Sequence, residues 1–147
     1  MKTDGAGWRG YNITALAWLG DAVFELWVRE HLLTGGAAAK ADELHLRAVA
    51  LVRAESQAEL ILRLKPFLTE EEAYVCKLGR NTGGRRPQGA DLAAYRQATA
   101  LEVLAGYWHI TGQKARLEEM LGKMLENVTE KMTENVTENV TEKIAWK

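Results

Sequence analysis

The segment from Ile13 to Val28 constrains the fold of this chain more than any other. It is apolar almost throughout, yet it carries Gly20 and Asp21 at its centre. A long apolar run bounded by polar and glycine-rich residues is typical of a buried helix. Carboxylates are seldom buried unless they are paired or bind a cation. We therefore expect Asp21 to be buried and to have a chemical role, with catalysis as the leading explanation.

The rest of the chain also follows helical periodicity. Only two prolines occur, and few segments alternate apolar with polar residues as strands do. Thr69 and Glu72 have the spacing of a capping box, which starts a helix. The sequence predicts an all-α fold with helices over residues 13–33, 40–64 (with a break near 53–56), 70–80, 91–110 and 113–125. We expect one catalytic domain over residues 1–125.

The residues from 126 to 147 form a separate tail. Asn127, Lys131, Asn135 and Asn139 each begin a four-residue unit that ends in Thr-Glu. An apolar residue at every fourth position would make a slowly rotating helical stripe, but valine and threonine are mediocre helix formers. A helical extension and disorder are equally compatible with this low-complexity segment. We assign it no chemistry.

Composition limits the classes of partner. The formal net charge is −1, so a polyanion would have to be held by a local basic patch. The single cysteine, Cys76, cannot form an internal disulfide, which suits a reducing compartment. The N-terminal residues do not resemble a signal peptide, and charged residues interrupt the apolar segment. We expect a soluble, cytoplasmic protein with no membrane partner.

A second carboxylate makes a metal site conceivable. Asp21 and Glu25 are four residues apart and share a helix face. Glu102 lies on a later helix whose face carries small residues, including Gly106, so another helix can approach closely. If that helix carries Asp21, two carboxylates meet, and a hard cation such as Mg²⁺ or Mn²⁺ would relieve their repulsion. Trp18, on the same apolar helix, is a candidate contact with a second subunit.

An alternative explanation needs no metal. Asp21 and Glu102 could each form a structural ion pair with an arginine, such as Arg29 or Arg96. Periodicity alone gives the two explanations about equal weight.

Four segments, in order, resemble one enzyme family. Leu16-Ala-Trp-Leu-Gly-Asp-Ala-Val-Phe-Glu25 resembles the signature helix of ribonuclease III domains, and most closely that of the Mini-ribonuclease III family. Leu68-Thr-Glu-Glu-Glu-Ala resembles the start of the family's central helix, and Lys77-Leu-Gly-Arg-Asn81 its Arg-Gly-Arg-Asn turn. Residues 90–107 resemble its C-terminal catalytic helix. The resemblance spans about residues 10–121.

The resemblance implies an all-α, homodimeric endonuclease domain that cleaves double-stranded RNA. Asp21 and Glu102 would be the catalytic carboxylates that bind Mg²⁺, with Mn²⁺ as a possible substitute. Glu25 would act on the metal indirectly, through a water, and Trp18 would lie in the dimer interface. The expected substrate is the stem of the large-subunit (23S) ribosomal RNA precursor, and ribosomal proteins are further candidate partners. RNA contacts are expected, largely by shape, at Lys77, Arg80, Asn81, Arg85, Arg86 and Arg96.

The chain departs from full-length ribonucleases III at two positions. Those enzymes surround the metal with extra acids, whereas this chain has Ala17 and Thr99 at the matching places. Fewer anionic ligands should weaken metal affinity, so one metal and two metals both remain open. The family lacks a separate double-stranded-RNA-binding domain, and we expect none in the residues after Leu125. The rival functional hypothesis is a non-catalytic module of this fold that binds RNA or ribosomes.

Overall fold

The computed structural model describes residues 7–35, 40–82 and 91–125, and every regular element in these ranges is a helix. The prediction of an all-α fold is therefore confirmed for the described chain. The predicted tail over residues 126–147 lies outside it. In chain order the elements are the short 3-10 helix η1 (Gly7–Gly10), α1 (Ile13–Thr34), α2 (Ala41–Val52), α3 (Ala54–Leu64), the short 3-10 helix η2 (Lys65–Phe67), α4 (Glu70–Asn81), α5 (Leu92–Ile110) and α6 (Lys114–Leu125).

Local polar side chains set where three of the helices begin. Oδ1 of Asn12 accepts a hydrogen bond from the backbone N–H of Thr14 at 2.8 Å. Asp91 accepts in the same way from Ala93 at 2.9 Å. The predicted capping box at Thr69 is present in full, with reciprocal bonds to α4. Such side chains replace the hydrogen bonds that the first helical N–H groups cannot make within the helix.

The predicted break in the second helical region occurs at Arg53, which has extended backbone angles between α2 and α3. Two buried side chains donate to carbonyl groups next to the break. Ser56 Oγ donates to the carbonyl of Ala50 at 2.7 Å, and Gln57 Nε2 donates to that of Val52 at 3.0 Å. Buried carbonyls need such partners, so the corner is a specified feature of the fold.

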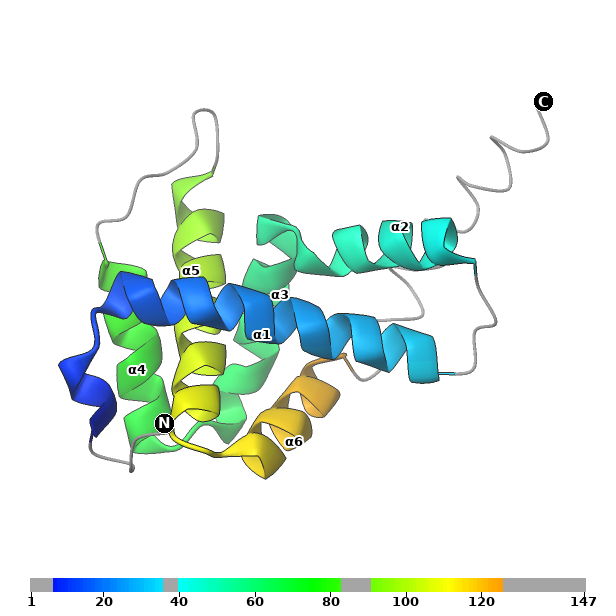
Figure 1. The fold of residues 1–147 in the computed structure, drawn as a ribbon. Coiled ribbons are helices and arrows are strands. Elements are labelled where there is room, and N and C mark those ends of the chain that lie inside the picture. Colours follow the sequence, from blue (N-terminus) through cyan, green and yellow to red (C-terminus); the bar gives the residue numbers. More distant parts are fainter. Residues whose placement is uncertain (1–6, 36–39, 83–90, 126–147) are drawn as a thin grey trace.

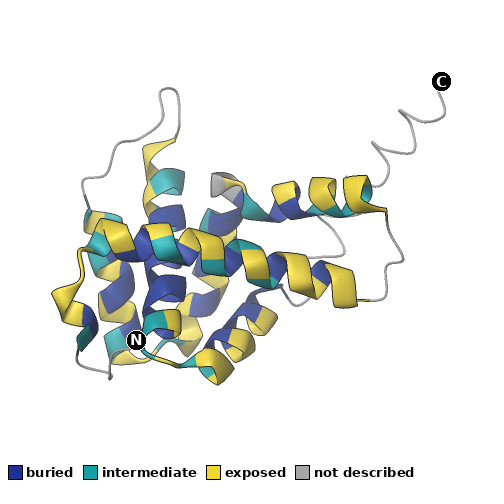
Figure 2. Ribbon diagram, in the orientation of Figure 1, coloured by how far each residue is buried: buried dark blue, intermediate teal, exposed yellow. Residues whose placement is uncertain are grey.

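Helix α5 is the centre of the molecule. It packs against α1, α3, α4 and α6, and α1 lies across it (Figure 1). The middle of α5 is buried, whereas α1 has both buried and exposed residues along its whole length (Figure 2). Leu101, Leu104 and Trp108 of α5 are completely inaccessible to solvent. Among the described helices, none is both long enough and apolar enough to cross a membrane.

Candidate active site

Two glycines bring the backbones of α1 and α5 into direct contact. A Cβ atom built on Gly20 would lie 1.6 Å from the carbonyl oxygen of Glu102, and one on Gly106 would lie 2.2 Å from that of Leu16. No side chain fits at such distances, so the crossing requires glycine on both helices. The small-residue face predicted on α5 is therefore where α1 packs, and Gly20 is the small residue on the α1 side of the contact. Asp21 follows Gly20 directly, which places the two candidate acids at this crossing.

The two acids differ in exposure. Glu102 is partly buried, whereas Asp21 is exposed, so the expectation that Asp21 is buried is wrong. Gly20 makes the close contact with α5, and the next residue along the helix turns about 100° away from that contact. Asp21 therefore lies beside the crossing rather than under it.

The electrostatics nevertheless couple the pair. Burial, and after it the charge of Asp21, raises the pKa of Glu102 to about 7. Partial desolvation, and after it the charge of Glu25, raises the pKa of Asp21. Among the described residues, no positive charge offsets these effects on either carboxylate.

The ion pairs with Arg29 or Arg96 that the alternative explanation named do not form. Arg29 binds Glu25 instead, with 2.5 Å between Nη2 and Oε1. Within the described parts of the chain, neither Asp21 nor Glu102 has an ion pair with any residue, and Arg96 has none either. Two adjacent carboxylates without a cation are electrostatically unfavourable, so this arrangement fits a bound divalent cation.

The ligand set is small. Among the described residues no group of three or more histidine, cysteine, aspartate or glutamate side chains is close enough to hold a metal ion. Ala17 and Thr99 are both buried, and the hydroxyl of Thr99 donates to the carbonyl of Tyr95 at 3.0 Å. Neither side chain adds an anionic ligand. Two carboxylates still fit Mg²⁺, which usually keeps several waters and takes only one or two protein carboxylates.

The expected RNA-binding residues lie toward one end of the bundle. Lys77 and Asn81 are exposed on α4, Arg80 is partly buried, and Arg96 is exposed on α5. The C-terminal end of α4 and the N-terminal end of α5 are at the same end of the molecule (Figure 1). Arg85 and Arg86 fall between these helices and lie outside the described residues.

The side of α1 that faces away from α5 is exposed and apolar. Trp18 is 81% exposed, Leu33 66% and Leu26 59%. Within a single chain, α1 is therefore not a core helix buried on all sides. Large apolar side chains this exposed on one helix are typical of surfaces that bind another protein.

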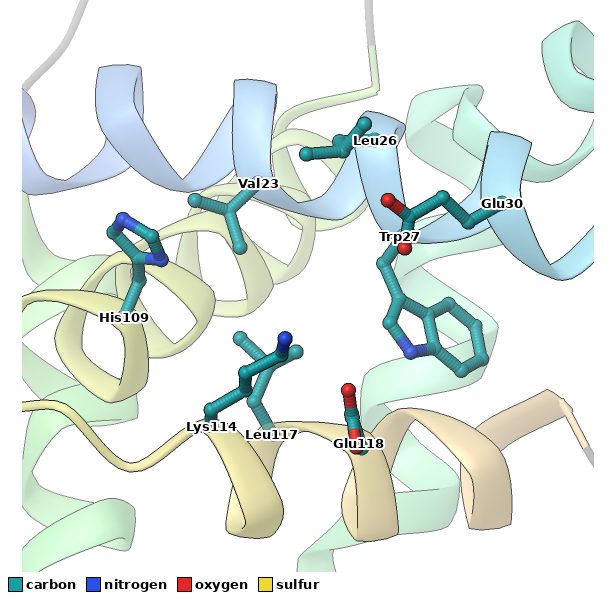
Figure 3. A pocket seen from close by; sticks show the side chains of 8 residues that line it. All are labelled: Val23, Leu26, Trp27, Glu30, His109, Lys114, Leu117 and Glu118. Carbon is teal, nitrogen blue, oxygen red and sulfur yellow. The ribbon is translucent and has the colours of Figure 1, made fainter.

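A pocket of about 260 Å³ opens between α1 and α6, and Leu26 of the exposed apolar side also lines it (Figure 3). It contains neither Asp21 nor Glu102. Its apolar part is formed by Val23, Leu26, Trp27 and Leu117, and the charged side chains around it are those of Glu30, Lys114 and Glu118. Glu30 and Glu118 outnumber Lys114 among these charges, which disfavours a polyanion, so we place no RNA contact here.

Sequence reasoning missed the most completely buried carboxylate among the described residues. Glu72 is 2% exposed, and its carboxylate accepts from Arg116 at 2.8 and 3.0 Å and from Trp108 Nε1 at 2.7 Å. Hydrogen bonds from Arg116, Thr69 and Trp108 outweigh burial and lower the pKa of Glu72 to about 2. The capping box in the sequence predicted only the hydrogen bonds between Glu72 and Thr69, and not those with Arg116 and Trp108. Glu72 is thus a structural buried acid, unlike the candidate pair at the crossing, whose pKa values are raised.

Comparison with known proteins assigns the chain to a family. The sequence model of one protein family, the ribonuclease III domain, matches residues 14–113. A Mini-ribonuclease 3 of Desulfitobacterium hafniense is 46% identical over 110 residues, which are 75% of this chain and 69% of the relative. The Mini-ribonuclease 3 of Symbiobacterium thermophilum is 44% identical over 107 residues, which are 72% of this chain and 82% of that relative. A crystal structure of a Fusobacterium nucleatum protein superposes with a TM-score of 0.73 at 25% identity, covering 82% of this chain and 97% of that one.

Proposed function

Because the chain belongs to the Mini-ribonuclease III family of endoribonucleases, we propose that it cleaves double-stranded RNA with Mg²⁺ held by Asp21 and Glu102. Ribonuclease III enzymes act on double-stranded RNA and generally depend on a divalent metal. The observation that carries the site assignment is the pair of carboxylates at the glycine crossing, neither of which has a cationic partner in the described ranges. Membership also disfavours the non-catalytic alternative, because the relatives are named as ribonucleases.

The proposed reaction is hydrolysis of a phosphodiester. A water oxygen bonds to phosphorus, the bond from phosphorus to the 3′ oxygen breaks, and the products are a 5′-phosphate and a 3′-hydroxyl. When bound, Mg²⁺ supplies Lewis-acid stabilisation of the charge that develops on the phosphate. Glu102 is held by the buried middle of α5, and Asp21 by the contact of Gly20 with that helix. Their spacing is therefore fixed by backbone contact.

Glu25 has a supporting role in this proposal. It lies one turn beyond Asp21, and its ion pair with Arg29 holds its carboxylate at the helix surface. From there its charge acts on Asp21, as the raised pKa of Asp21 reflects. Glu25 adds negative potential that attracts a cation to the crossing without being a direct ligand.

We further propose that the substrate is the 23S ribosomal RNA precursor and that the active form is a homodimer in the cytoplasm. The exposed apolar side of α1, which includes Trp18, is the proposed contact between subunits. Two subunits would cut the two strands at paired sites. Lys77, Arg80, Asn81 and Arg96 would bind phosphates and 2′-hydroxyls, together with Arg85 and Arg86. Mn²⁺ would substitute for Mg²⁺, and ribosomal proteins would present the precursor.

The test is a cleavage assay on duplex RNA with Mg²⁺, comparing wild type with Asp21→Asn and Glu102→Gln. Both variants should lose at least about 100-fold in rate, since each removes a charge that holds the metal. Glu118→Gln is the matched control, because Glu118 is an exposed acid on α6, and it should cut normally. Unchanged cutting by Asp21→Asn would refute the site. Equal rates on the precursor stem and on an unrelated duplex would refute the substrate.

A further inference from the structure

The outward side of α4 carries a row of three side chains, Tyr74, Lys77 and Asn81. Their spacing of three and four residues puts them on one face of the helix, over about 10 Å of its length. All three are exposed, Tyr74 by 48%. In the described parts of the chain, none of these side chains has a hydrogen bond, ion pair or ring contact. The row is therefore available to a partner.

The fold fixes the direction in which the row points. On the opposite side of α4, a Cβ on Gly79 would lie 2.8 Å from the Cα of Ala100, so one end of α4 lies directly on α5. At the other end, Glu72 is bound to Trp108 and Arg116. These two contacts prevent α4 from rotating about its axis. The row therefore faces away from α5 as a rigid surface.

Charge along the row changes from one end to the other. The exposed Glu70 precedes it at the start of α4, and Lys77 and Arg80 lie toward the C-terminal end. A polyanion is repelled at the first position and attracted at the last two. Tyr74 lies at the boundary, one turn before Lys77. A duplex bound at Lys77 and Asn81 would thus reach Tyr74 and go no further.

We propose that Tyr74 is an RNA-binding residue whose phenol hydroxyl forms a hydrogen bond with a ribose 2′-hydroxyl in the minor groove. This inference rests on the proposed function, which makes duplex RNA the substrate. The wide, shallow minor groove of A-form RNA displays 2′-hydroxyls, whereas paired bases offer no free face for a tyrosine ring to stack on. A phenol hydroxyl can both donate to and accept from such a group. Tyr74 would therefore help to distinguish RNA from DNA.

The test measures binding of the full chain to duplex RNA in EDTA, where no cleavage occurs. Tyr74→Phe removes only the hydroxyl, and Tyr11→Phe makes the same change at another exposed tyrosine, 41% exposed, as the control. One hydrogen bond at an interface corresponds to about threefold to tenfold in affinity. Each protein is measured on an all-ribose duplex and on a duplex with 2′-deoxy substitutions throughout one strand.

If the phenol hydroxyl contacts a 2′-hydroxyl, removing both groups should weaken binding no more than removing either one. Tyr74→Phe should bind the all-ribose duplex about threefold to tenfold more weakly than wild type, and its ratio of ribose to deoxy affinity should be smaller by the same factor. Tyr11→Phe should keep the wild-type ratio. If Tyr74→Phe keeps the wild-type ratio while wild type binds RNA, this inference is wrong and the proposed function stands. If wild type neither binds duplex RNA here nor cleaves it with Mg²⁺, both fail.

Discussion

Replacing Gly20 with alanine should damage both the fold and the active site, because Gly20 is where the two helices touch. The new Cβ would lie 1.6 Å from the carbonyl oxygen of Glu102, whereas ordinary contacts begin at 3.4 Å. The helices would have to separate locally by about 1.8 Å, the difference between these two distances. Overpacking of this kind costs about 1–3 kcal/mol, and more when backbone is the obstacle. Here the obstacle is backbone, so we take the upper end of that range, about 3 kcal/mol. Alanine regains about 1 kcal/mol of helix propensity, which leaves an expected net loss of about 2 kcal/mol or more.

The same displacement moves Asp21 relative to Glu102. A misplacement of about 1 Å can reduce an enzymatic rate by about 100-fold. Cleavage should therefore fall at least that far, even at temperatures where the Gly20→Ala variant is still folded. The measurements are urea unfolding followed by circular dichroism, and initial cleavage rates well below the unfolding midpoint.

Gly122→Ala is the matched control. Gly122 lies inside α6, and a Cβ there would have no neighbour within 4 Å. The substitution should stabilise the protein by about 0.5–1 kcal/mol through helix propensity alone and leave cleavage unchanged. If Gly20→Ala behaved like Gly122→Ala, the two helices would not be in backbone contact, and the reasoning about the site would be wrong.

Three further predictions follow from the charged and exposed groups. Glu72→Gln should destabilise the protein by about 3 kcal/mol, which is the free energy that corresponds to lowering the pKa of Glu72 from 4.5 to about 2. In wild type this contribution to stability is complete above pH 4.5 and disappears as the pH falls through 2. Acid unfolding of the two proteins would measure it. The pKa of Glu102, about 7, means that protons compete with the metal, so the divalent cation concentration needed for cleavage should fall as the pH rises to 7 and then level off. Trp18→Glu should shift the protein from dimer to monomer in sedimentation velocity; wild type sedimenting as a monomer at micromolar concentration would contradict the dimer.

Helix boundaries were predictable from the sequence because they depend on neighbours a few residues away. The caps at Asn12 and Thr69 form hydrogen bonds within three residues, and asparagine and threonine are residue types that favour this position. The partners of Glu72 were not predictable in this way. Trp108 and Arg116 lie 36 and 44 residues further along the chain, so only the packing of α4 against α5 and α6 brings them together.

Asp21 shows the same limit at the site itself. Its apolar surroundings in the sequence suggested burial, but burial depends on which side of α1 meets α5. That side is set by Gly20, and the importance of Gly20 depends in turn on Gly106 of another helix. Periodicity could describe each helix face, but it could not pair two faces or give the rotation at which they meet.

The exposure of Asp21 is also what the proposed substrate requires. A duplex of RNA is too wide to enter a closed cavity, so a carboxylate that acts with its phosphate must be reachable from the surface. Glu102 is partly buried and has a pKa raised to about 7. Asp21, which is exposed, has less of its hydration to lose when a cation binds. A rigid pair with one partly buried member and one exposed member can hold a cation at the surface, which a pair of fully buried acids could not do for a polymer.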